Sequence, residues 1–232
     1  MSTSLEGRAS QAPRPAGSGG LAELARVPWR SLVGPLSLRR RALAWTLWTW
    51  GLALPFGVVA CVLVLLDLRA LPLACVAAAH ALLIPMLHVR RGATVLRRPA
   101  ARAGGAAEQR ALGLLGDLLG HEARELCRET GYAVERGQLG TWVIGWHGAV
   151  LVEPGARRCH CFCVQVDGED LPSADRTAHL LLALREDERG FATVANHVWA
   201  GSTRRLRRRL DAVARQALDS AIRQQRRAST AA

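Results

Sequence analysis

Two long apolar runs dominate the first half of the hydrophobic pattern. Residues 42–66 form 25 consecutive positions without a charge, and a second run covers residues 70–89. A helix needs about 20 apolar residues to cross the hydrocarbon core of a bilayer, and a longer run crosses with some tilt. We therefore predict a transmembrane helical hairpin. The alternative is a pair of buried helices in the core of a soluble protein.

Arginines gather on one side of both runs, whereas the loop between them has a single Arg69 beside Asp67. The positive-inside rule then predicts a multi-pass protein of the inner (plasma) membrane with both termini in the cytoplasm. Tryptophans cluster at the same end of the first run, where indoles settle at headgroup level. The predicted membrane-interface anchors are Trp45, Trp48, Trp50, Arg39, Arg40, Arg41, Arg90 and Arg91.

One ionisable side chain, His80, lies in the middle of the second run. Such a group within a membrane is a candidate functional residue. Neither run offers it an acidic partner. We expect a neutral His80 that bonds to the hydroxyl of Thr46 or Thr49 or to a backbone carbonyl, in a hairpin that anchors the chain rather than transports a solute.

The pattern changes after about residue 106. Residues 107–130 repeat leucine and alanine at helical spacing, with Gly131 suited to the C-terminal cap. A last helix is predicted over 202–227, with Ser202 as its N-cap. Between the two helices, short β-branched and aromatic runs bounded by turn residues predict strands. These runs cover 139–146, 148–153, 159–166 and 191–200.

Residues 173–187 fit either a strand or a helix capped by Ser173, and we favour the strand. The fold class is therefore α+β: a transmembrane hairpin, then a cytoplasmic domain of a helix, a four- to five-stranded mainly antiparallel sheet and a C-terminal helix. The predicted division of the chain is a disordered tail at 1–24, a basic juxtamembrane segment at 25–41, membrane helices at 42–66 and 70–89, a basic linker at 90–106 and the domain at 107–232.

Composition narrows the chemistry. The chain has 31 basic and 19 acidic residues, a formal net charge of +12, and every basic residue is arginine. The absence of lysine is typical of a GC-rich bacterial genome. It excludes Schiff-base catalysis by lysine and the phosphate-binding lysine of a P-loop. The chain also has no GxSxG, HExxH or GxGxxG motif. Histidines at 121, 147, 179 and 197 are scattered among carboxylates, and we interpret His121 beside Glu122 as solvated surface.

Three cysteines alternate along a predicted strand, at 159, 161 and 163. They share one face of that strand, and His160 points to the other. Neighbours on one face lie about 6.5 to 7 Å apart, too far for a tetrahedral zinc site with Zn–S bonds near 2.3 Å. We expect Cys159, Cys161 and Cys163 to be buried apolar residues, with a metal or redox role as the alternative. No cofactor is predicted.

Residues 139–155, "LGTWVIGWHGAVLVEPG", resemble the first hairpin of the nuclease-related (NERD) domain. Gly145 and Gly148 match the glycines of that motif, and Glu153 falls on its metal-binding glutamate. The family's aspartate falls on Gly140 and its lysine on Gly155. The resemblance therefore implies the fold of a nuclease hairpin that has lost a magnesium ligand and its cationic partner, and so argues against catalysis.

The segment "TRRLRRRL" concentrates positive charge at the start of the last predicted helix, at Arg204, Arg205, Arg207, Arg208 and Arg209. Anionic lipid attracts such clusters by about 1 kcal/mol per arginine near the surface. Nucleic acid is the rival partner, and a solvated basic face is the third reading.

Taken together, these features predict an integral membrane accessory or scaffold protein, not an enzyme, whose domain binds another protein at the inner leaflet. The alternative is a membrane-tethered nucleic-acid-binding protein or a degenerate nuclease.

The arginine asymmetry gives the first testable prediction. Reporter fusions after Ala16 and after Ala231 should both report the cytoplasm. A periplasmic signal from either fusion would contradict the hairpin topology.

Overall fold

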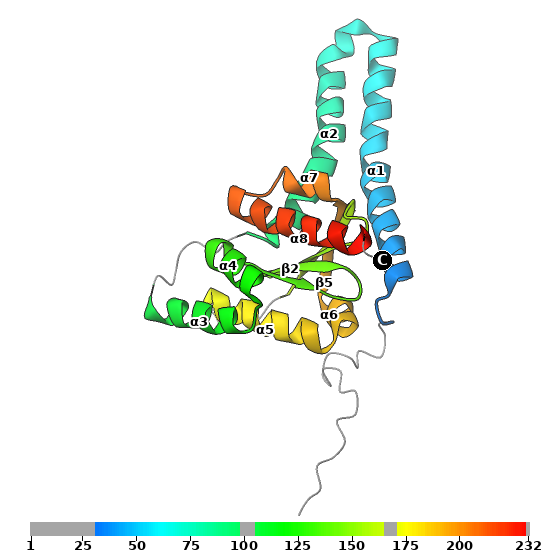
Figure 1. Ribbon diagram of the computed structural model, residues 1–232. Coiled ribbons are helices and arrows are strands. Elements are labelled where there is room, and N and C mark those ends of the chain that lie inside the picture. Colours follow the sequence, from blue (N-terminus) through cyan, green and yellow to red (C-terminus); the bar gives the residue numbers. More distant parts are fainter. Residues whose placement is uncertain (1–30, 98–104, 165–170, 231–232) are drawn as a thin grey trace, which may run out of the picture.

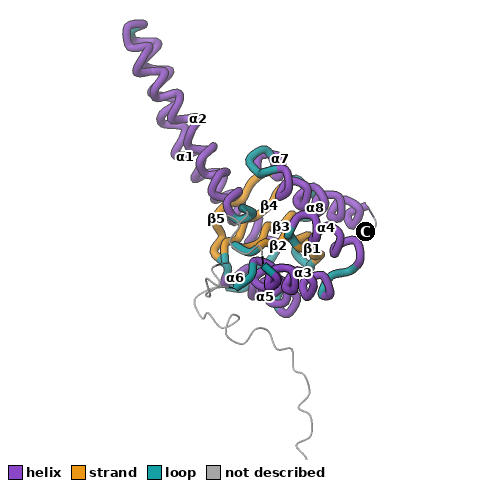
Figure 2. Tube along the Cα trace, turned by 90° about the vertical axis from the view of Figure 1, so that its left-hand side faces the viewer, coloured by secondary structure: helices purple, strands orange, loops and turns teal. Residues whose placement is uncertain are grey.

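Two antiparallel helices begin the part of the chain that the computed structural model describes, residues 31–97, 105–164 and 171–230. Helix α1 covers Pro35–Leu66 and helix α2 covers Leu71–Thr94, joined by the short 3-10 helix η1, Leu68–Ala70. Both long helices are apolar enough to cross a membrane. They project together from the rest of the molecule (Figures 1 and 2). The predicted tail at 1–24 lies outside the described residues.

Small side chains let the two helices of this hairpin approach each other. Ala53, Ala60, Ala74 and Ala77 are buried, while most leucines and valines of the hairpin are exposed. Alanine at a helix contact allows close backbone packing, as in helices associated within lipid. His80 contacts the backbone carbonyl of Val76 at 2.8 Å and its ring stacks on Phe56. The expected carbonyl contact of His80 is thus present.

Both helices are longer than their apolar runs. Helix α1 begins at Pro35, because proline is suited to the first turn and Ser37 bonds to the backbone N–H of Gly34 at 2.8 Å. Helix α2 continues to Thr94. The predicted anchor arginines at 39–41 and 90–91 therefore lie on the helices themselves.

Five antiparallel strands form one sheet in chain order. The strands are β1 (Ala133–Arg136), β2 (Thr141–Gly145), β3 (Gly148–Val152), β4 (Arg158–Cys163) and β5 (Asn196–Ser202). Consecutive pairing needs only short turns between the first four strands. Gly148 permits one of them, because its φ is +153° and a Cβ atom there would lie 2.0 Å from the carbonyl oxygen of Phe162. The predicted α+β class is confirmed, and β1 is the strand that the sequence pattern missed.

Helices cover both faces of the sheet. On one face lie α3 (Ala106–Asp117), α5 (Ser173–Glu186) and α6 (Glu188–Val194). On the other lie α7 (Thr203–Arg207), α8 (Ala212–Thr230) and the end of α2. Helix α4 (His121–Thr130) contacts β1, α3 and α8. Alternate strand residues therefore enter two different cores: Trp142 and Ile144 one, Val143 between them the other.

The strand favoured for residues 173–187 is wrong, because this segment is helix α5. Its buried residues Leu180, Leu181 and Leu184 follow helical spacing. The start of the helix is capped from a distance: the Glu108 carboxylate accepts the backbone N–H of Ser173 at 2.9 Å. That partner lies 65 residues earlier in the chain, which local sequence cannot reveal.

Three other predicted elements need correction. The helix at 107–130 is two helices, divided at 118–120, and Gly131 caps the second in the left-handed conformation. The helix at 202–227 is also two, because the chain turns after α7 and Asp211 accepts the backbone N–H of Ala214 at 2.7 Å at the start of α8. The strand at 191–200 begins only at Asn196, since residues up to Val194 belong to α6.

The base of the hairpin is part of both cores. Val33 and Leu38 pack on one side of the sheet, and Val89, Val95 and Leu96 pack on the other. Among the described residues, strand β5 pairs with β4 alone, and both hairpin helices contact it. Covering an edge strand in this way prevents pairing with other chains. The domain is therefore built around the end of the hairpin.

A shortened chain beginning at residue 105 tests this shared core. Removing five buried apolar side chains exposes both faces of the sheet, and each such loss costs about 2–5 kcal/mol. We expect the shortened chain to be insoluble or to melt at a much lower temperature than the full chain, measured by circular dichroism. Equal melting temperatures would show that the domain folds without the hairpin.

Candidate functional site

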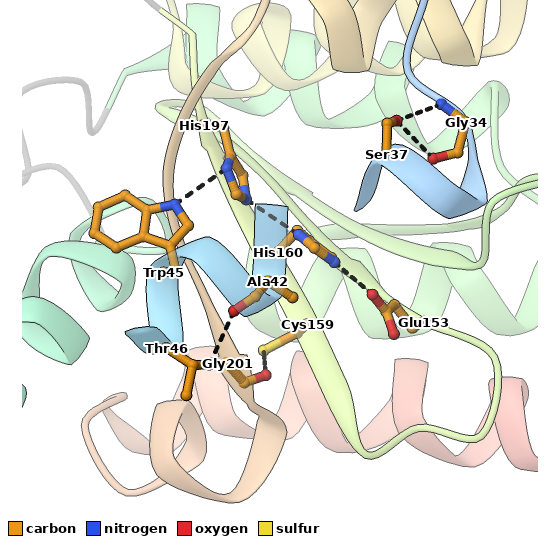
Figure 3. Close-up of polar contacts among 10 residues, drawn as sticks. All are labelled: Gly34, Ser37, Ala42, Trp45, Thr46, Glu153, Cys159, His160, His197 and Gly201. Atoms are coloured by element: carbon orange, nitrogen blue, oxygen red, sulfur yellow. Dashed lines mark hydrogen bonds and ion pairs between the residues drawn. The ribbon is translucent and has the colours of Figure 1, made fainter. Parts of the chain in front are cut away.

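A chain of polar side chains joins the hairpin to the sheet (Figure 3). The Glu153 carboxylate, directly after β3, lies 2.6 Å from Nε2 of His160 on β4. Nδ1 of His160 lies 3.1 Å from Nε2 of His197 on β5. Nε1 of Trp45 on α1 donates to Nδ1 of His197 at 3.2 Å. Four elements thus meet in one continuous line of hydrogen bonds.

The indole at one end determines the direction of this chain. A tryptophan N–H only donates, so Nδ1 of His197 must be the acceptor and its Nε2 carries the proton. That proton goes to Nδ1 of His160, whose own Nε2–H then donates to Glu153. Every bond is satisfied with two neutral imidazoles and one carboxylate. A third proton on the pair of rings would place two donors face to face.

Burial favours the same protonation state. His160 is fully buried, at 0% exposure. Burial, the largest cause, and the nearby Arg41 lower the pKa of His197 to about 3. The hydrogen bond from His160 lowers the pKa of Glu153, and nearby Arg158 and Arg39 act in the same direction. The Glu153 carboxylate therefore stays charged and the His197 ring stays neutral.

These properties indicate a positioning role for the chain. The chain ends on the Trp45 indole N–H, which does not titrate in water, and on the Glu153 carboxylate. Between these ends, each ring is fixed in place by a hydrogen bond on both of its nitrogens. The effect of the chain is to hold α1 against the β4–β5 edge through polar bonds that work only at one register of the two elements.

The cysteine strand has the geometry that its alternation predicts. Cys159 and Cys161 are fully buried against α7, α8 and α2, and Cys163 is partly buried on the same face. His160 lies on the opposite face beside Phe162. Burial raises the pKa of the Cys161 thiol well above its usual value, which disfavours the reactive thiolate. Within 31–97, 105–164 and 171–230, no three His, Cys, Asp or Glu side chains gather as metal ligands would.

The predicted basic cluster lies beside the hairpin. Helix α7 contacts α2, and in both views it lies on the side of the domain from which the hairpin projects (Figures 1 and 2). Arg207 is bound bidentately by Asp219 of α8, at 2.7 and 2.9 Å. The four remaining arginines of the cluster are exposed and form no salt bridge with another described residue: Arg204, Arg205, Arg208 and Arg209.

The predicted interface anchors divide into two groups. Trp45 is partly buried and packs against the domain, with its edge toward His88 and His197. Trp48 and Trp50 are exposed on the hairpin surface. Of the predicted anchor arginines, Arg41 is partly buried. The other four are exposed: Arg39, Arg40, Arg90 and Arg91.

The residues of the nuclease-related motif have different structural roles. Gly140 lies before β2, where a Cβ atom would meet the carbonyl oxygen of Val152 at 2.2 Å. Gly155 adopts φ +88° in the turn after Glu153. Glu153 itself is engaged by His160, so its role in this structure is the polar chain.

Sequence reasoning missed the pairing of His197 with His160. The two residues are 37 positions apart and meet only because a β-bulge at Cys161–Phe162 brings His197 opposite Phe162. The sequence offered one signal for this pairing: His160 and His197 each lie on a predicted strand. The other three domain histidines stay apart from this site, with His121 and His179 exposed and His147 against Trp146.

The polar chain predicts acid sensitivity. Because folding lowers the pKa of His197, the unfolded chain binds more protons than the folded chain between about pH 6.5 and about pH 3. The free energy of unfolding therefore decreases as the pH is lowered through that window. Glu153, whose pKa is also lowered by folding, loses its contribution at the acid end. His197→Gln should flatten the profile of melting temperature against pH, while His121→Gln, at an exposed site, should not. Identical profiles for wild type and His197→Gln would contradict this assignment.

Comparison of the chain with protein-family models, with characterised proteins and with solved structures gives no match. The resemblance to the nuclease-related domain at residues 139–155 stays a prediction carried by its own motif.

Proposed function

We propose that the chain is an inner-membrane protein with both termini in the cytoplasm, whose α+β domain is held on the inner leaflet and serves as an accessory or scaffold for a partner protein. The observation that carries this proposal is the position of the basic cluster. Helix α7 lies beside α2 at the base of an apolar hairpin. A membrane that received the hairpin would meet these arginines with its headgroups.

The length of the exposed hairpin supports this placement. Residues of β4, β5 and α7 line a shared pocket with α1 that reaches as far as Trp50. From Gly51 to Leu66 there remain 16 residues, or about 24 Å of helix. A hydrocarbon core is about 30 Å thick. Closing that difference draws headgroups of the near leaflet toward the domain, where arginine side chains reach them by extending along the interface.

Attachment by two independent means suits a scaffold. The shared cores fix the orientation of the domain on the hairpin. The opposite layer, formed by α3, α5 and α6, faces away from the hairpin (Figure 1). Leu114 on α3 and Leu182 on α5 are exposed in that layer. This is the surface available to a partner protein while the basic side meets lipid.

Changing Arg204, Arg205, Arg207, Arg208 and Arg209 to glutamine tests the lipid assignment. The full chain is reconstituted into nanodiscs that mix anionic and zwitterionic lipid, and the lipids retained after extraction are measured by mass spectrometry. Wild type should enrich anionic lipid, and the variant should lose that enrichment, because each arginine contributes about 1 kcal/mol near the surface. The enrichment should also weaken with salt.

A matched control removes five exposed arginines elsewhere: Arg110, Arg128, Arg223, Arg226 and Arg227. It should keep the enrichment of wild type. Binding of a labelled DNA duplex, measured by anisotropy, tests the rival partner. The nucleic-acid proposal would replace the lipid proposal if three results were found together. The DNA affinity would increase at low salt, DNA would still bind in anionic nanodiscs, and the variant with the five α7 arginines changed to glutamine (the α7 variant) would lose DNA binding.

A further inference from the structure

A pocket of about 280 Å³ lies between the hairpin and the domain. Ligand pockets begin near 300 Å³, so the space suits a small polar group rather than a whole lipid. The hairpin contributes Ala42, Trp45, Thr46, Thr49, Trp50, Pro85 and Val89 to its walls. The domain contributes Arg157, Arg158, Trp199, Ala200, Gly201, Ser202 and Arg205.

The charge of this pocket is positive. Three arginines line it and no carboxylate does. None of Arg157, Arg158 and Arg205 forms a salt bridge with a residue of the described ranges. Arg158 lies close enough to lower the pKa of Glu153, but a bond to His160 already occupies that carboxylate. Arginines that line one pocket can bind a phosphate, because a guanidinium group binds phosphate in a bidentate manner.

The other polar groups of the walls differ in what they offer. The hydroxyls of Thr46 and Thr49 donate to the carbonyls of Ala42 and Trp45 in their own helix. The Trp45 indole donates to His197. An anion therefore finds its hydrogen-bond donors in the arginines, with the Trp50 indole and the Ser202 hydroxyl beside them.

The apolar surroundings of the pocket favour a lipid phosphate over a soluble one. Trp50, which is exposed on α1, and Pro85 on α2 border the exposed apolar surface of the hairpin. An acyl chain attached to a phosphate in the pocket would lie along that surface. A soluble phosphate compound would gain nothing from it.

We propose that this pocket is a discrete site for the phosphate headgroup of one anionic glycerophospholipid, held by Arg157, Arg158 and Arg205. The proposal rests on the proposed function, since it requires the hairpin to be in a membrane. It goes beyond that function because it names a single bound lipid, distinct from the general attraction of anionic lipid to α7. The bound lipid would fill the space between hairpin and domain and so complete their interface.

Native mass spectrometry of the full chain tests the site. The protein is taken from nanodiscs of phosphatidylglycerol in phosphatidylcholine into a mild detergent, and bound lipids are counted. Wild type should keep one phosphatidylglycerol per chain. The variant Arg157→Gln, Arg158→Gln, Arg205→Gln should bind it about a hundredfold more weakly, the effect of three arginines at about 1 kcal/mol each.

A second variant leaves the charges intact. Thr46 is exposed on α1 and faces the pocket, so Thr46→Phe fills the space with little cost to folding. It should also lose the single lipid while keeping general anionic enrichment. The matched control Arg204→Gln, Arg208→Gln, Arg209→Gln should do the reverse.

Retention of the lipid by both pocket variants, or equal retention of phosphatidylcholine by wild type, overturns the site. In that case loss of enrichment in the α7 variant would still support the proposed function. Unchanged enrichment in the α7 variant would instead count against that function, whatever happens at the pocket.

Discussion

Packing of the hairpin base against the edge strand β5 is the contact on which the rest of the structure depends. Without it, β5 would expose a free edge, and both cores would lose buried apolar side chains from α1 and α2. The contact is close: a Cβ atom at Gly92 would lie 3.0 Å from Trp199. Hairpin and domain therefore form one folded unit, although the hairpin is far more apolar than the domain.

Polar bonds add specificity to this apolar contact. Apolar packing tolerates small shifts of one helix along a sheet, whereas the chain from Trp45 through His197 and His160 to Glu153 is satisfied in one register only. Breaking it would leave the buried His160 imidazole without partners, which costs more than the bonds themselves contribute. The partly buried Glu153 carboxylate is hydrogen-bonded to His160, which reduces the cost of removing its charge from water.

The orientation fixed in this way has electrostatic consequences. Helix α7 and the start of β4 bring their arginines beside the hairpin rather than into solvent on the far side of the domain. Repulsion within such a cluster is unfavourable unless an anion neutralises it. Asp219 does so for Arg207. For the pocket arginines, the proposed anion is a lipid phosphate, which would join the two halves of the chain by the same means.

The sequence by itself determined the elements whose signal is local. The uncharged runs specified two long helices, because the length and apolarity of a continuous stretch are enough to predict a helix that could cross a membrane. Alternation placed Cys159 and Cys161 on one strand face and His160 on the other, since strand geometry has a fixed period. The left-handed cap at Gly131 was likewise visible in the residues around it.

Tertiary structure decided what depended on distant partners. Residues 173–187 became a helix because leucines at helical spacing met the core and Glu108 capped its start, against a β-like run of apolar residues. His197 joined His160 through a bulge that no local pattern announces. Arg207 found Asp219, and Arg157, Arg158 and Arg205 came together from two segments about 50 residues apart. These arrangements follow from packing free energy summed over the whole chain, which no short stretch of sequence contains.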